Sequence, residues 1–114
     1  MRAIKLVSLI GIVFAVLSCE SNTYADISGV AVANPTYEAN INPMMRTHCT
    51  SCHGAGGEKQ DVPFETYEEV TGNAELIACR IDGTSCLLMP ASGRIPQSQI
   101  DMFNLWIAQG YVKQ

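Results

Sequence analysis

The hydrophobic positions near the end of the chain repeat at helical spacing. Ile100, Phe103 and Ile107 fall on one face of a helix, and neighbouring apolar residues widen that face: Met102, Leu105 and Trp106. Ser98, with Asp101 three residues later, forms the start of a capping box, and the glycine at position 110 stands where helices commonly end. The pattern therefore predicts a helix over residues 98–110, with Trp106 in the core.

A second helix is predicted over residues 43–52. Asn42 is the expected N-cap, Pro43 suits the first helical position, and the glycines of "GAGG" should end the helix. Its apolar positions form a mixed face: Ile41, Met44, Met45 and Cys49. The methionines on helical faces are expected to fill the core: Met44, Met45 and Met102.

The middle of the chain should be mostly loop with two short helices. "ETYEEV" (65–70) and "NAELIACR" (73–80) each predict one helical segment, and Asp82 with Gly83 predicts a tight turn. The prolines and the glycine of "LLMPASGRIP" (87–96) predict an irregular loop. Because no strand pattern competes with these helices, the predicted fold class is all-α.

The first eighteen residues have the pattern of an export signal. Arg2 and Lys5 precede an apolar stretch that is too short for a comfortable membrane span and ends in "VLSC". This ending resembles the lipoprotein signal, in which Cys19 becomes the lipidated first residue. The alternative is cleavage before Asp26, which would release a soluble periplasmic protein. We expect an exported chain on the periplasmic side of a bacterial membrane, anchored to it by a lipid.

The remaining chain divides into a polar tether and one small domain. Residues 19–39 show no sustained period, and residues 40–114 form the expected domain. A domain of about 75 residues buries little apolar surface, so it needs a cofactor or cross-links for stability.

The charge balance restricts the partners. The chain has 7 basic and 11 acidic residues, and loss of Arg2 and Lys5 with the signal leaves 5 against 11, a net charge of −6. No basic stripe exists, so nucleic acid is not an expected partner. An acidic surface favours weak, salt-dependent docking to positively charged proteins.

The stretch "HCTSCH" concentrates the candidate chemistry. A zinc site, a thiol redox pair and covalent haem attachment all use such clusters. Zinc needs four ligands, and simultaneous ligation by the adjacent Cys52 and His53 is awkward; a redox pair would need a βαβ context, which is not visible. In haem attachment, Cys49 and Cys52 each add to a vinyl group and His53 ligates the iron. Cys-x-x-Cys-His in an exported chain favours one covalent haem c.

Residues 40–112 resemble a small class I cytochrome c domain. "CTSCH" matches the attachment motif of that family, "LLMP" resembles its methionine loop, and "IDMFNLWIAQGYV" resembles its C-terminal helix. The resemblance implies three or four short helices and irregular loops wrapped around the haem, with His53 and Met89 as the two iron ligands. Pro90 independently biases Met89 toward an extended backbone. His48 is a less favoured distal ligand, because its neighbour Cys49 is tethered to the same haem.

Two further cysteines flank the turn of "RIDGTS". The turn could bring Cys79 and Cys86 together, and the expected compartment is oxidising, so a disulfide is favoured over two free thiols. Such a bridge would clamp the segment that leads into Met89.

The expected function is electron transfer. With both axial positions filled, the iron has no open site, so we expect a single-haem carrier rather than an enzyme. The alternatives are a haem-bearing accessory domain or subunit of an exported dehydrogenase or oxidase, and a gas-binding haem sensor.

Overall fold

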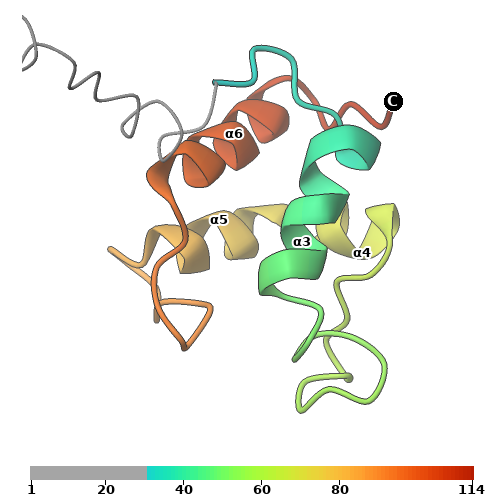
Figure 1. Cartoon of the computed structure of the whole chain (residues 1–114), viewed down its shortest axis with the longest axis vertical. Coiled ribbons are helices and arrows are strands. Elements are labelled where there is room, and N and C mark those ends of the chain that lie inside the picture. Colours follow the sequence, from blue (N-terminus) through green and yellow to red (C-terminus); the bar gives the residue numbers. More distant parts are fainter. Residues whose placement is uncertain (1–30) are drawn as a thin grey trace, which may run out of the picture.

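The computed structural model describes residues 31–114, which are helical and contain no strand in that range (Figure 1). Within residues 31–114, a five-residue π-helix leads directly into the first of four α-helices. In chain order the elements are η2 (Tyr37–Ile41), α3 (Asn42–His48), α4 (Tyr67–Gly72), α5 (Ala74–Asp82) and α6 (Gln97–Ala108). The prediction of an all-α chain is confirmed for the described residues.

The first helical segment begins and ends earlier than predicted. Thr36 is the N-cap, because its hydroxyl accepts the Ala39 N–H at 3.3 Å. Asn42 is not the N-cap of α3, which is Ile41; it is the C-cap of η2, and its N–H bonds to the Tyr37 carbonyl. Pro43 lies in the first turn of α3, close to its predicted place. The α-helix ends at His48 rather than at residue 52. Tyr37 is buried, so the packed body includes residues before the expected domain start at position 40.

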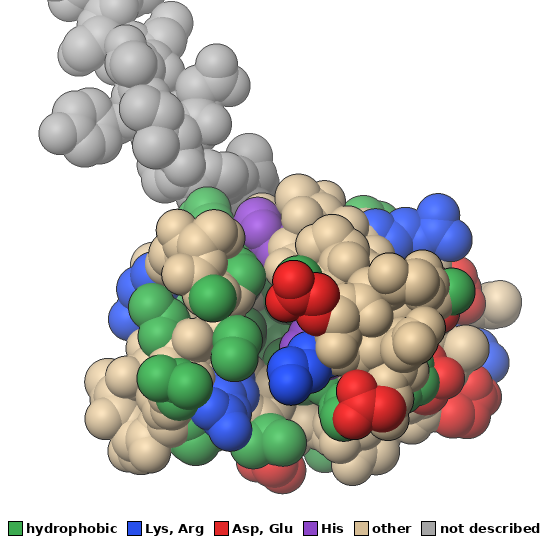
Figure 2. Space-filling model, turned by 90° about the horizontal axis from the view of Figure 1, so that it is seen from below, with side chains coloured by type: hydrophobic (Ala, Val, Ile, Leu, Met, Phe, Trp, Pro, Cys, Tyr) green, Lys and Arg blue, Asp and Glu red, His purple; other side chains and the backbone are tan. Residues whose placement is uncertain are grey.

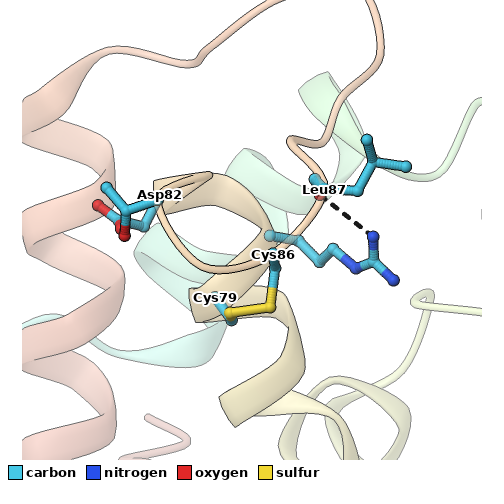
Figure 3. The surroundings of a disulfide bond; sticks show 6 residues. Cys79, Asp82, Cys86 and Leu87 are labelled. Carbon is cyan, nitrogen blue, oxygen red and sulfur yellow. Dashed lines mark hydrogen bonds between the residues drawn. A yellow bond between two sulfur atoms is a disulfide. The ribbon is translucent and has the colours of Figure 1, made fainter.

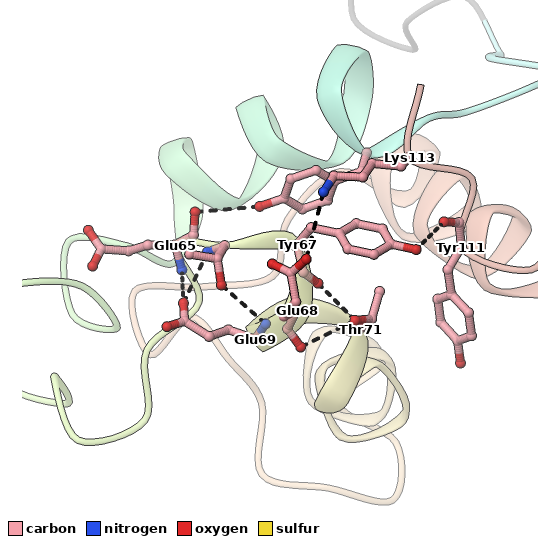
Figure 4. Close-up of polar contacts among 9 residues, drawn as sticks. Glu65, Tyr67, Glu68, Glu69, Thr71, Tyr111 and Lys113 are labelled. Atoms are coloured by element: carbon pink, nitrogen blue, oxygen red, sulfur yellow. Dashed lines mark hydrogen bonds and ion pairs between the residues drawn. The ribbon is translucent and has the colours of Figure 1, made fainter.

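A full capping box starts α4. The Thr66 hydroxyl accepts the Glu69 N–H at 3.3 Å, and Glu69 Oε2 accepts the backbone N–H groups of Glu65 and Thr66 at 2.8 and 3.0 Å (Figure 4). These hydrogen bonds satisfy donors that a helix start otherwise leaves unpaired. They fix the point at which the long loop after α3 ends and α4 begins.

The tight turn expected at Asp82 and Gly83 is the end of a helix. Gly83 caps α5 in the left-handed conformation with φ of 73°. L side chains rarely adopt this φ, which favours glycine, and a Cβ here would lie 2.6 Å from Leu88 Cδ1, so a larger residue would also displace the Leu88 side chain. The close approach packs the next segment against the helix end.

The predicted capping box of α6 is wrong. Pro96 is the N-cap and makes no side-chain cap hydrogen bond, and Ser98 lies inside the helix. Asp101 instead accepts a hydrogen bond at 2.8 Å from Gln97 Nε2, one helical turn away. The observed end of α6 is close to the predicted one: the helix ends at Ala108, and Gly110 follows with φ of 82°.

The core is centred on Trp106, which is fully buried as predicted. Four aromatic rings surround the indole at centroid distances of 5.2 to 6.5 Å: Tyr37, Tyr67, Phe103 and Tyr111. The expected core methionines Met44 and Met45 are buried, and the partly buried Met102 packs against the core. Residues from η2, α4, α6 and the C-terminal segment thus meet at one side chain.

The capping box makes stability depend on pH. Backbone hydrogen bonds from Glu65 and Thr66 hold the pKa of the Glu69 carboxyl below its ordinary value of 4.5. Because the folded pKa is lowered, this stabilisation is complete at neutral pH and is lost as the pH falls through the folded pKa.

We expect Glu69→Gln to lower the free energy of unfolding at pH 7 and to flatten its decline toward pH 3. Denaturant titrations at several pH values, with the exposed Glu75→Gln as control, measure this; a decline as steep as wild type contradicts it.

Candidate functional site

The cluster "CTSCH" lies where α3 gives way to a loop. Although the α-helix has ended, turn hydrogen bonds continue: the Cys49 N–H bonds to the Met45 carbonyl at 2.8 Å, and the His53 N–H bonds to the Cys49 carbonyl at 2.8 Å. Cys49 is half-buried and Cys52 is exposed, and both thiols are free. The two thiols and the imidazole are therefore held on one compact turn.

The His53 ring is fixed in its orientation and its tautomer. Nδ1 lies 2.8 Å from the Val62 carbonyl oxygen, and the ring stacks on Phe64 with centroids 4.5 Å apart. A carbonyl can only accept, so Nδ1 carries a proton, and in the neutral ring the lone pair is on Nε2. Metal-ligating histidines commonly show this arrangement, in which the second nitrogen donates to a backbone oxygen.

Two glycines allow the loop to close around the cysteines. A Cβ on Gly54 would lie 2.5 Å from the Thr50 carbonyl, and one on Gly57 would overlap the Cys52 carbonyl oxygen. The Lys59 N–H then bonds to that Cys52 oxygen at 2.8 Å, and the Phe64 N–H bonds to the His53 oxygen at 2.8 Å. The glycines of "GAGG" thus fold the loop back onto the cluster.

Met89 is carried by the segment that follows α5. Its N–H bonds to the Arg80 carbonyl at 2.9 Å, and the residue is half-buried. Cys79 and Cys86 form a disulfide with their Cα atoms 5.5 Å apart (Figure 3). The predicted pair is thus joined, three residues before the methionine.

The two segments leave the helices on the same side. The loop after α3 and the segment after α5 both descend below the helices in Figure 1. Seen from below, this face is hollowed; hydrophobic side chains gather beside the hollow, and histidine side chains are visible within the face (Figure 2). Among the described residues, the most exposed large hydrophobic residue belongs to the segment after α5: Leu87, 71% exposed.

His48 is engaged with another helix. Its Nε2 lies 2.8 Å from Gln99 Oε1 on α6, and the contact is partly buried. The side chain joins the end of α3 to the start of α6. This bond gives His48 a structural partner that the sequence pattern did not indicate.

The Cys49 thiol does not have the environment of a redox-active thiol. Burial raises the pKa of the Cys49 thiol to about 11, so little thiolate exists at neutral pH. Catalytic thiols of the Cys-x-x-Cys type depend on a lowered pKa. Among residues 31–114, no three His, Cys, Asp or Glu side chains gather as a metal-binding group.

Comparison with protein-family models, curated proteins and solved structures finds no match for this chain. Within the described residues, no helix has the length and apolar character needed to cross a bilayer. The predicted signal sequence, the lipidated Cys19 and the alternative cleavage before Asp26 lie outside the described residues.

Sequence reasoning missed the residues that hold the cluster in place. Val62 contributes only a backbone carbonyl, which has no signature in the side-chain pattern. Phe64 and Gln99 could have been noticed only as an aromatic residue in a polar loop and a polar residue at a helix start. Their distances from His53 and His48 in the sequence leave no periodic signal.

The loop geometry predicts different effects of two glycine substitutions. Gly57→Ala should destabilise the protein by about 1–3 kcal/mol, because the new methyl group meets the Cys52 backbone. Gly72→Ala, at the end of α4 with open space around it, is the control and should be neutral or stabilising by up to about 1 kcal/mol. Equilibrium unfolding measures both; equal effects would mean that the close approach at Gly57 is unimportant.

Proposed function

We propose that this chain is a single-haem c-type cytochrome that carries electrons. The observation that carries the proposal is the pairing of two free thiols with an imidazole whose Nδ1 is already bonded to the Val62 carbonyl. This donor set fits haem c, since the thiols of Cys49 and Cys52 can form thioethers and His53 Nε2 can bind iron. We propose further that the chain has a cytochrome c fold, and the all-helical structure of residues 31–114 is compatible with this.

The residues of this chain would perform distinct tasks. Cys49 and Cys52 would hold the cofactor covalently, and the Val62 carbonyl with the Phe64 ring would keep the His53 imidazole in one orientation. Met89 would supply a neutral thioether as the second axial ligand. The bound haem supplies a one-electron couple, and a His/Met ligand pair raises the reduction potential relative to two histidines. With both positions filled, the iron offers no site for a substrate.

The proposed carrier acts outside the cytoplasm. The export pattern of residues 1–18 and the lipoprotein-like Cys19 support a periplasmic protein anchored by a lipid. A net charge of −6 after loss of the signal, from 5 basic and 11 acidic residues, supports transient contact with positively charged redox proteins.

Covalent attachment is testable directly. The protein produced with export and haem maturation should keep haem staining on the polypeptide after denaturing electrophoresis, because thioether bonds survive unfolding. Cys49→Ser/Cys52→Ser should lose the stain. Haem that extracts from the wild-type protein into acidified organic solvent would contradict the proposal.

The ligand role of Met89 predicts a selective loss. Met89→Ala should abolish the weak near-infrared absorption band of ferric methionine-ligated haem, lower the reduction potential, and open the reduced iron to carbon monoxide. The haem should stay attached. Met44→Ala, Met45→Ala and Met102→Ala are controls that should leave ligation unchanged, since their side chains pack in or against the core. Ready binding of carbon monoxide by the wild-type protein would contradict methionine ligation.

A further inference from the structure

The segment that carries Met89 is fastened to the last turns of α5 by three links. The Cys79–Cys86 disulfide is the first. Arg80 supplies the other two: its Nη1 donates to the Leu87 carbonyl at 3.2 Å, and its own carbonyl accepts the Met89 N–H at 2.9 Å (Figure 3). Two adjacent helical residues therefore bind a stretch of only four residues.

The far side of the same loop returns to the same helix end. Arg94 Nη1 donates to the Asp82 carbonyl at 2.9 Å, and the Arg94 guanidinium lies 3.6 Å from the Asp82 carboxylate. Between these flanks, Leu88 packs closely over Gly83. The loop is thus closed on the C-terminal end of α5 from both directions.

Hydrophobic burial contributes little to holding this loop. Leu87 is 71% exposed, residues 91–94 are exposed, and the buried apolar anchor, Ile95, comes only at the loop's end. Segments with few buried contacts open locally at low free-energy cost. The covalent and polar links therefore take the place of packing.

We infer that Arg80 and the Cys79–Cys86 disulfide are positioning groups that set where Met89 lies. The guanidinium fixes the backbone at Leu87, two residues before the thioether, while the disulfide restricts the conformations open to the segment when it detaches. Neither group is an iron ligand. The inference rests on the proposed function, in which Met89 must meet an iron atom held by a distant part of the chain.

Amide hydrogen exchange of the complete haem-loaded protein tests the fastening. The Met89 amide should exchange about tenfold faster in Cys79→Ser/Cys86→Ser and about threefold faster in Arg80→Gln. Arg46→Gln is the matched control: it removes one positive charge from an exposed position on α3, away from this loop, and should leave Met89 protection unchanged. Protection of the Phe103 amide in the core reports global unfolding. Unchanged Met89 exchange in both test variants, or equal acceleration at Phe103, overturns the inference.

A second measurement connects the fastening to ligation. On warming, the near-infrared band should disappear at a lower temperature in both test variants than in wild type, with the haem still attached, and carbon monoxide should bind about tenfold faster. Arg46→Gln should keep wild-type behaviour. If the wild-type protein lacks the near-infrared band, methionine ligation is contradicted. The fastening of the Met89 segment is not contradicted by that result, and the amide exchange rates alone then test it.

Discussion

The buried indole of Trp106 is the contact on which the rest of the structure depends. Its Nε1–H donates to the Val112 carbonyl at 2.9 Å, and the same oxygen accepts the Tyr37 N–H at 2.8 Å. One carbonyl thus joins α6 to the start of the helical body. The Tyr67 hydroxyl adds α4 by donating to the Tyr111 carbonyl at 2.8 Å (Figure 4). Without this assembly, α3 would have no fixed position from which to present Cys49 and His53.

The loop after α3 and the segment after α5 are held by different physical means. The loop after α3 is fixed by local backbone bonds and by glycines that allow close approach, as at Gly57 and Cys52. The segment after α5 is fixed by the disulfide and by Arg80. Local turns fold wherever their own sequence allows, whereas the second segment depends on a completed α5 and on an oxidised cysteine pair. The position of His53 therefore depends less on the tertiary structure than the position of Met89 does.

The sequence predicted the elements that depend on period or on short spacing. The period of α6, the burial of Trp106 and the joining of Cys79 to Cys86 follow from residues that are close along the chain. Helix caps were predicted poorly, because Ile41 and Pro96 hold the N-cap positions assigned to Asn42 and Ser98. Cap choice depends on where the preceding loop arrives, which packing decides. The bond between His53 and Val62 was invisible for the same reason.

In the proposed carrier, the residues that would attach the cofactor and the residue that would be its second ligand belong to different parts of the fold. The proposed cofactor attachment would use Cys49 and Cys52, and His53 follows them directly, so these three groups lie together in one local unit. Met89 lies 36 residues beyond His53, and its position is set by α5. A change near α5 can therefore alter the thioether contact while leaving attachment intact. Because the second ligand determines how strongly ferrous iron is favoured, the potential would be governed mainly from α5 and its disulfide. In such a protein, haem content and redox potential are properties of two separate parts of the chain.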